Sequence, residues 1–157
     1  MEAGTATCRK CKSPMQIEPL SGVAGEEGGV KVAFLKLPAL ACAQGHRRFV
    51  RPEFPGQLLD RLMAVTQVPA AEARGMVFKS YHCGKCGEKL GGAAATPKAF
   101  EFELAVAGVD PFRVALTVPV HKCASCSHEQ VRSQAEVTEK TPAAMAHAFK
   151  AAGIPPG

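Results

Sequence analysis

The sequence predicts a small α+β fold made of two tandem, metal-stapled units. Paired cysteines recur in both halves of the chain, alternating apolar and polar residues separate the pairs, and a helical pattern follows the later pair of each half. The 157 residues include only 6% aromatic residues and no Trp. Small domains with thin cores often need a metal or disulfides for stability, so two stapled units are expected rather than one large core.

The first unit begins with the pair Cys8 and Cys11. Residues 15–20 alternate apolar and polar side chains, as in a half-buried strand. Residues 21–29 are rich in Gly and Glu and predict a flexible hairpin connection. Residues 30–40 predict the partner strand, which leads the chain to a second group of metal-binding side chains.

That second group is Cys42 and His46, and a helix is expected after it over residues 55–66. Proline is tolerated in the first turn of a helix. We expect the helix to bury its apolar face against the hairpin; a groove for a partner helix is the alternative. The apolar face consists of Phe54, Leu58, Leu59, Leu62 and Met63.

The second unit repeats this order. Thr141 and Pro142 are typical of a helix start, and Gly153 of a helix end. We expect units over residues 1–66 and 76–157, joined by a linker over 67–75. The elements expected in the second unit are the pair Cys83 and Cys86, strands over 100–106 and 112–120, the pair Cys123 and Cys126, and a helix over 142–152.

The four cysteines of the second unit have the spacing of a structural zinc site. Zn²⁺ takes four soft or borderline donors in a tetrahedron, and each CxxC turn can direct two thiolates to one ion. Rubredoxin-like iron is the alternative metal, and unligated core thiols are the metal-free alternative. The predicted ligands are Cys83, Cys86, Cys123 and Cys126.

The first unit predicts an altered version of the same site. Gly45 stands where the second unit has Cys126, and His46 follows one residue later, where its longer side chain can still reach the ion. A degenerate site without metal is the alternative. With the predicted ligands Cys8, Cys11, Cys42 and His46, the chain would hold two structural Zn²⁺.

Redox and catalytic roles are not expected for these cysteines. Chelated thiolates are poor free nucleophiles, which disfavours thiol exchange. A catalytic zinc keeps one ligand position open, whereas both predicted sites are closed by four donors. We therefore expect no enzyme, no catalytic residues and no small-molecule substrate. Three histidines near the second site are supporting hydrogen-bond donors, occasional ligands or simply exposed residues: His82, His121 and His128.

Localisation and charge exclude few partners. The sequence contains no apolar run of about 20 residues and no secretory signal at its start, so we expect a cytoplasmic protein without a membrane partner. The formal net charge of +5 falls by three when seven thiolates bind two Zn²⁺. The remaining charge by itself indicates no class of partner.

The second unit resembles a known family. Its two CxxC pairs, the two apolar strands between them, Val118-Pro119 before Cys123, and a helix near Thr141 are similar to the zinc-binding N-terminal domain of YgiT/MqsA-type bacterial antitoxins. The resemblance covers roughly residues 80–152 and, more loosely, 5–66. It implies that the four cysteines bind a structural zinc and that the zinc domain contacts a protein partner. The helix-turn-helix domain that binds DNA in that family is expected to be missing here.

Two functional classes follow from these features. The first is a protein-interaction or regulatory module with two structural zinc ions. The second is a nucleic-acid-binding protein that uses the basic end of the first unit, with Phe49 available to stack on a base. The charges at that end could also serve only to balance the thiolates. The basic residues are Arg9, Lys10, Lys12, Arg47, Arg48 and Arg51.

Overall fold

The computed structural model describes residues 6–91 and 94–155. In the first half the elements are β1 (Ala6–Thr7), β2 (Pro14–Leu20), β3 (Val23–Glu27), β4 (Val30–Leu35), β5 (Leu37–Cys42), β6 (Arg47–Arg48) and α1 (Phe54–Val65). In the second half they are β7 (Glu72–Arg74), β8 (Ser80–His82), β9 (Thr96–Leu104), β10 (Phe112–Lys122), β11 (Glu129–Gln130) and α2 (Gln134–Ala151). The fold is a small α+β arrangement with antiparallel strand pairs, as the sequence predicts.

The first hairpin bends in its middle. β2 pairs with β5, and β3 pairs with β4, so one antiparallel ribbon continues on both sides of the bend. At the bend, φ is positive at Gly22 (74°) and at Lys36 (61°), and residues other than glycine enter this region only at some cost. The strand predicted over residues 30–40 is therefore two strands that break at Lys36.

Residues 21–29 were predicted to be a flexible connection, and this prediction is wrong because they contain β3. Val23 of this strand faces the core and Glu26 faces solvent. The Gly and Glu content of the segment is unusual for a strand, but pairing with β4 and packing against α2 stabilise it. Tertiary contacts here outweigh local preference, as is common for strands.

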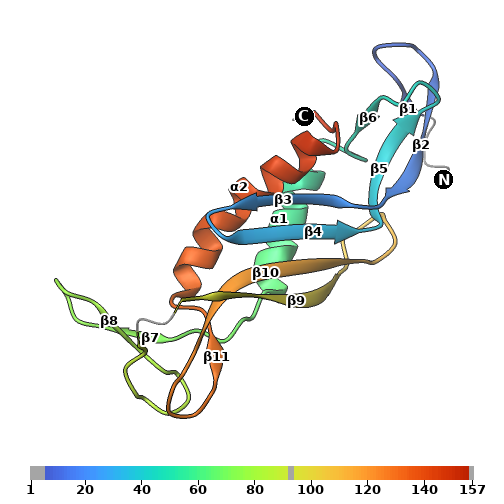
Figure 1. Ribbon diagram of the computed structural model, residues 1–157. Coiled ribbons are helices and arrows are strands. Elements are labelled where there is room, and N and C mark those ends of the chain that lie inside the picture. The colour runs from blue at the N-terminus through green and yellow to red at the C-terminus, as the bar shows by residue number, and fades with distance from the viewer. Residues whose placement is uncertain (1–5, 92–93, 156–157) are drawn as a thin grey trace.

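The central sheet contains strands from both halves of the chain. β4 pairs antiparallel with β10, where Phe34 lies opposite Val114, and β9 pairs with β10 along its other edge. The order through the middle of the sheet is β3-β4-β10-β9, and β11 pairs with the end of β10. The hairpins of the two halves thus lie side by side in one sheet (Figure 1).

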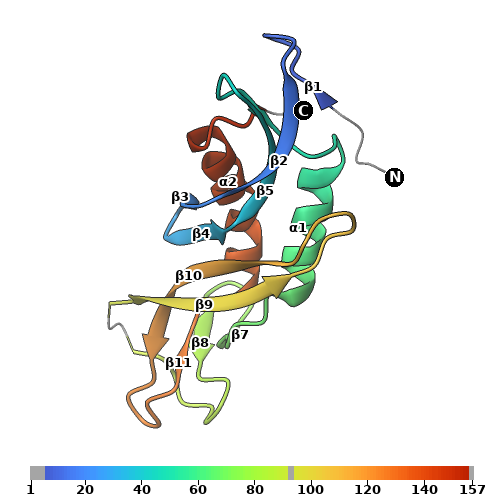
Figure 2. The same ribbon diagram turned by 90° about the vertical axis from the view of Figure 1, so that its right-hand side faces the viewer.

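Both helices cover the same face of this sheet, and each packs on strands of the other half (Figure 1 and Figure 2). α2 packs against β3 and β4, whereas α1 packs against β9. The main core therefore combines side chains from both halves. Its fully buried members include Phe34, Phe54, Leu37, Leu58, Leu62, Leu104, Leu116, Val114 and Val118.

The helix predicted over residues 55–66 is confirmed as α1, with a proline in its first turn. Phe54, Leu58 and Leu62 of the predicted apolar face are completely buried, and the other two residues of that face are half-buried. The face therefore packs into the core and offers no groove to a partner.

The second helix begins at Gln134, so the start predicted at residue 142 is wrong. Pro142 lies inside α2, where it removes one backbone hydrogen bond. Val137 and Thr141, on either side of the affected turn, are buried, and their packing offsets this loss. Exposed polar residues in the first turns hid the helix from the sequence pattern. Neither α2 nor any other helix within residues 6–91 and 94–155 is long and apolar enough to cross a membrane.

Residues 67–75 connect the two halves and are held to the body. Val68 is buried in the main core, and Ala70 forms a parallel bridge with Val131. β7 then pairs with β8 in a separate two-stranded hairpin. This hairpin projects from the end of the molecule where β11 lies (Figure 1).

Candidate metal centres

Two groups of metal-binding side chains lie near opposite ends of the molecule, one beside β1 and the other beside β11 (Figure 1). Within each group the four potential ligand atoms all lie within 4.8 Å of one another. All eight residues that the sequence predicts as ligands are thus brought together in two sets. The Cys₃His cluster consists of Cys8, Cys11, Cys42 and His46, and the Cys₄ cluster of Cys83, Cys86, Cys123 and Cys126.

The sulfur separations in the Cys₄ cluster fit a tetrahedron. The Sγ atoms of Cys83 and Cys126 are 3.6 Å apart, and those of Cys86 and Cys123 are also 3.6 Å apart. Four sulfurs placed about 2.3 Å from a central ion would stand about 3.8 Å from one another. A disulfide would bring two sulfurs to about 2.05 Å, and all four thiols are free. The cluster therefore has the dimensions of a metal site.

Three of the four ligand-bearing turns share one backbone conformation. In the turn at Cys83, the Cys83 N–H donates to Glu88 O at 2.7 Å, and the Gly87 N–H donates to Cys83 O at 2.9 Å. Gly87 has a positive φ of 82°, which lets the chain reverse within this short turn. Both hydrogen bonds recur in the turns at Cys8 and Cys123, with positive φ at Lys12 and Ser127.

The fourth turn, from Cys42 to His46, is one residue shorter than the other three. The Cys42 N–H donates to His46 O at 3.1 Å, and the Gly45 N–H donates to Cys42 O at 3.0 Å. Gly45 takes the positive φ, 88°, so a cysteine there would be strained. The second donor is instead His46, whose Nδ1 lies 3.3 Å from Cys8 Sγ and 3.4 Å from Cys42 Sγ. The imidazole reaches the cluster from one position later in the chain.

Gln130 in β11 supports the Cys₄ cluster and is absent from the sequence predictions. It is fully buried; its Nε2 donates to Cys83 Sγ at 3.2 Å and its Oε1 accepts the Gly84 N–H at 2.8 Å. The N–H groups of Lys85 and Cys86 also point at Cys83 Sγ, at 3.4 and 3.5 Å. The hydrogen bond from Gln130, followed by those from the backbone, favours the thiolate and lowers the pKa of Cys83 to about 5. A polar residue in a two-residue strand leaves no pattern from which this role could be predicted.

The histidines near the Cys₄ cluster do not take this supporting role in the described hydrogen bonds. The ring of His82 bonds Ser80 Oγ at 3.1 Å and Gly87 O at 3.2 Å. His128 contributes its backbone oxygen, which accepts a hydrogen bond from Gln130 Nε2 at 3.3 Å. Support for the sulfur atoms therefore comes from an amide side chain and backbone N–H groups.

The Cys₃His cluster has a more apolar setting. Met15 is buried together with Cys8 and Cys42 in a small core separate from the main one. Burial raises the pKa of Cys42, whereas hydrogen bonds with Ser13 lower the pKa of Cys11 to about 6. The thiols of one cluster thus differ in how readily they ionise without a cation.

The six basic residues predicted at this end lie in three different settings. Arg9, Lys10 and Lys12 are exposed on the first turn. Arg51 is directed elsewhere, and its Nε donates to Gln57 Oε1 at 2.9 Å. Nucleic-acid binding at this end stays a prediction that rests mainly on the three exposed residues.

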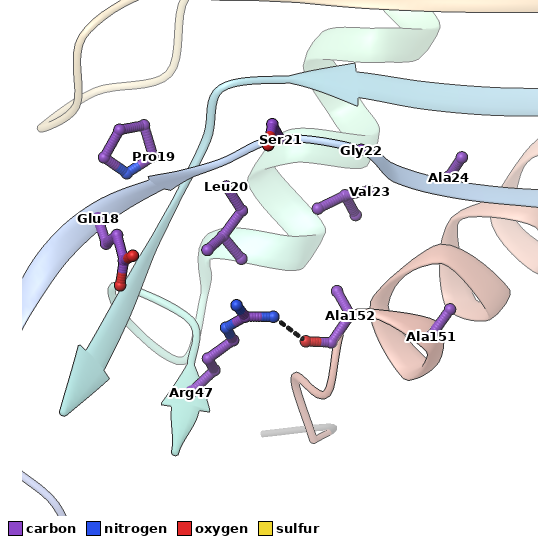
Figure 3. Close-up of a pocket in the computed structure, with 10 residues that line it drawn as sticks. All are labelled: Glu18, Pro19, Leu20, Ser21, Gly22, Val23, Ala24, Arg47, Ala151 and Ala152. Carbon is purple, nitrogen blue, oxygen red and sulfur yellow. Dashed lines mark hydrogen bonds between the residues drawn. The ribbon is translucent and has the colours of Figure 1, made fainter. Parts of the chain in front are cut away.

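The remaining two, Arg47 and Arg48, form β6 and are half-buried. Arg47 donates to Ala152 O at 2.8 Å, which ties the sheet of the Cys₃His cluster to the end of α2 (Figure 3). Cationic side chains often bind the last carbonyls of a helix in this way. Arg47 also lines a shallow pocket of about 350 Å³, whose other walls are Glu18, Pro19, Leu20, Ser21, Gly22, Val23, Ala24, Ala151 and Ala152.

Phe49 was predicted to be available for stacking on a base, and this is wrong. Its side chain is only 7% exposed. The ring meets Phe149 edge-on at a centroid distance of 4.9 Å and lies 6.3 Å from Phe54. Phe49 directly follows β6, where the chain turns into the main core, and it joins the two helices.

Fold and clusters together define a small α+β protein with two cysteine-rich sites that could hold metal ions. Compared with known protein families, curated proteins and solved structures, the chain matches none. The resemblance to YgiT/MqsA-type zinc domains therefore stays a prediction that rests on the cysteine and strand pattern.

Proposed function

We propose that this is a non-catalytic zinc protein that acts as a protein-interaction or regulatory module, with one structural ion near each end. The observation that carries the proposal is the closure of each cluster on four donors at separations suited to one tetrahedral ion. Cys₄ and Cys₃His are the donor sets that Zn²⁺ takes in structural sites. The expected content is two Zn²⁺ per chain.

The position of the clusters in the chain supports a structural role. Cys8 precedes β2 and Cys42 ends β5, so an ion between them would clamp the open end of the bent ribbon. Cys83 follows β8 and Cys123 follows β10, so the second ion would clamp the projecting hairpin to the central sheet. Four protein donors also fill a tetrahedral shell and leave no position for a reacting water.

We also infer that the two halves are divergent copies of one unit, built in the order turn, hairpin, turn, helix. Three ligand-bearing turns share the same hydrogen bonds, which supports a common origin. β4 and β10, each the second strand of its hairpin, pair antiparallel, as expected when two copies meet about a two-fold axis. In this arrangement the metal ends point outward, where partners can reach them.

Metal analysis of protein purified without added metal tests the first part of the proposal. Native mass spectrometry should give a mass increase of two Zn²⁺ per chain, and iron would be recognised by its mass and colour. Cys42→Ser and Cys86→Ser should each remove one ion. Wild-type protein that purifies without either ion, or variants that keep both ions, would contradict the structural role.

The interaction role needs a separate measurement. Crosslinking in native cells, followed by mass spectrometry, should recover a stoichiometric protein partner, as the resemblance to a toxin-contacting zinc domain suggests. The same experiment with Cys86→Ser should lose a partner that binds the Cys₄ end. Recovery of no partner above the untagged background would overturn this role while leaving the zinc content unaffected.

A further inference from the structure

The tip of the β7–β8 hairpin exposes three consecutive apolar side chains. Met76 is 96% exposed, Val77 83% and Phe78 90%. Within residues 6–91 and 94–155, the other large exposed apolar residues are Ile17 at 48% and Leu35 at 44%, and neither belongs to this group. Single exposed apolar residues are normal on a protein surface, whereas an exposed apolar group points to a contact with another molecule.

The tip is a defined turn on an anchored arm. Gly75 has a φ of 101°, and a Cβ there would overlap the carbonyl oxygen of Phe78, so the backbone closes tightly at this point. At the base, the Leu90 N–H donates to Tyr81 O at 2.8 Å, which attaches β8 to the turn of the Cys₄ cluster. The apolar residues are thus held out from the body, where the hairpin projects (Figure 1).

Basic residues predominate around the tip. Arg74 and Lys79 flank it, one on each side. Glu72 pairs with Arg74 at 3.4 Å, on the side of Arg74 away from the tip. Further from the tip, the guanidinium of Arg132 lies 5.4 Å from the ring centroid of Tyr81 in β8. Glu88 and Lys89, next to the base of the hairpin, contribute one charge of each sign.

We propose that residues 76–78 insert into the surface of an anionic lipid bilayer, with Arg74 and Lys79 at the level of the headgroups. Residues 76–78 form the loop between the two strands, and each of their side chains is at least 83% exposed, so the body of the protein does not cover the apolar tip. A bilayer surrounds such a tip, whereas a protein surface covers one side of it. The cations on both flanks match the negative surface potential of anionic lipids. The expectation of no membrane partner, drawn from the lack of a spanning segment, does not apply to this contact.

Sedimentation of the full, metal-loaded chain with vesicles tests the proposal. The protein should bind vesicles of equal parts phosphatidylcholine and phosphatidylglycerol more tightly than phosphatidylcholine alone. Phe78→Ser should weaken binding by about tenfold or more. Lys79→Gln should weaken it about fivefold on the anionic vesicles only. Ile17→Ser and Lys31→Gln are matched controls on exposed side chains outside the β7–β8 hairpin and should bind as the wild type does.

Tryptophan fluorescence gives an independent readout, since the chain contains no Trp. Phe78→Trp should shift its emission to the blue with anionic vesicles and be quenched by brominated lipid, whereas Leu35→Trp should show neither effect. The proposal is overturned if the wild type does not bind anionic vesicles at low salt, or if Phe78→Ser binds equally well. A tip-dependent complex with a protein or a second copy, without vesicle binding, would overturn it too. Metal content measured on the same samples separates this outcome from a failure of the zinc proposal.

Discussion

Replacing Gly25 by Ala tests the packing that joins the two halves. Gly25 lies in β3 directly against α2. A Cβ at this position would overlap the carbonyl oxygen of Ala144 and the backbone nitrogen of Ala148, and would lie 2.9 Å from Ala148 Cα. All three are backbone atoms of the helix, which no side-chain rotation can move aside.

The expected loss of stability follows from this overlap. Carbon atoms in ordinary contact are about 3.5–4.0 Å apart, so α2 must withdraw from β3 by roughly 1 Å. Overpacking lowers the free energy of unfolding by about 1–3 kcal/mol. Ala also makes the unfolded chain stiffer than Gly does, which raises the free energy of unfolding by about 0.4–1 kcal/mol. We expect the free energy of unfolding to fall by about 1–2 kcal/mol, which lowers Tm by about 2–8 °C in a chain of this size.

Thermal and urea unfolding of the zinc-loaded protein measure this change. Gly56→Ala is the matched control, because Gly56 is exposed in α1 and a Cβ there meets no atom within 4 Å. In a helix this substitution should raise stability by up to about 1 kcal/mol. The same chemical change should thus have opposite signs at the two positions. If Gly25→Ala unfolds at or above the wild-type temperature, α2 does not cover β3 as described, and the interlocked packing is wrong.

Three further predictions concern the metal clusters. Cys86→Ser should reduce hydrogen-exchange protection in the β7–β8 hairpin. The central sheet should keep its protection, because both halves of the chain contribute to its core. Global unfolding of this variant would show instead that one ion supports the whole fold. Gln130→Leu should lower zinc affinity about 10–100-fold in a chelator competition. The control Gln16→Leu, at an exposed position, should leave the affinity unchanged. If Gln130→Leu binds zinc as tightly as the wild type, Gln130 only fills space. In metal-free protein the pKa of Cys83 is lowered from 9.0 to about 5. This shift contributes stability that is complete above about pH 9, declines as the pH falls and is lost below about pH 5. Urea unfolding across this range measures it, and a Cys83→Ser variant with the same profile would contradict the assignment.

The features that the sequence predicted are those with a local signature. The two sets of candidate metal ligands follow from the chemistry and spacing of cysteine, as in Cys83 and Cys86. Helix α1 follows from an apolar face that repeats at helical spacing. The early start of α2 was missed because Val137 is the one large apolar residue in its first two turns, and a single residue makes no helical pattern. In each case the predictable part is encoded within a few neighbouring residues.

The features that were missed depend on contacts between distant parts of the chain. β3 forms because β4 and α2 cover it, which its own Gly and Glu content does not indicate. The pairing of β4 with β10 brings Leu35 opposite Arg113, and no pattern in either strand specifies that partner. Gln130 acts through a sulfur far away in sequence, at Cys83. Phe49 is buried in part by Phe149 of α2, which lies 100 positions later in the sequence.

The pairing of β4 with β10 also determines when the fold can be completed during synthesis. All four residues of the Cys₃His cluster have been made once His46 leaves the ribosome, so the ion that we propose there could bind and shape the bent ribbon early. β4 must then wait for residues 113–117 before its open edge is paired. Pairing between distant segments is slow, and unpaired strand edges favour aggregation. The nascent first half is therefore the stage at which we expect the chain to depend most on available zinc and on chaperones.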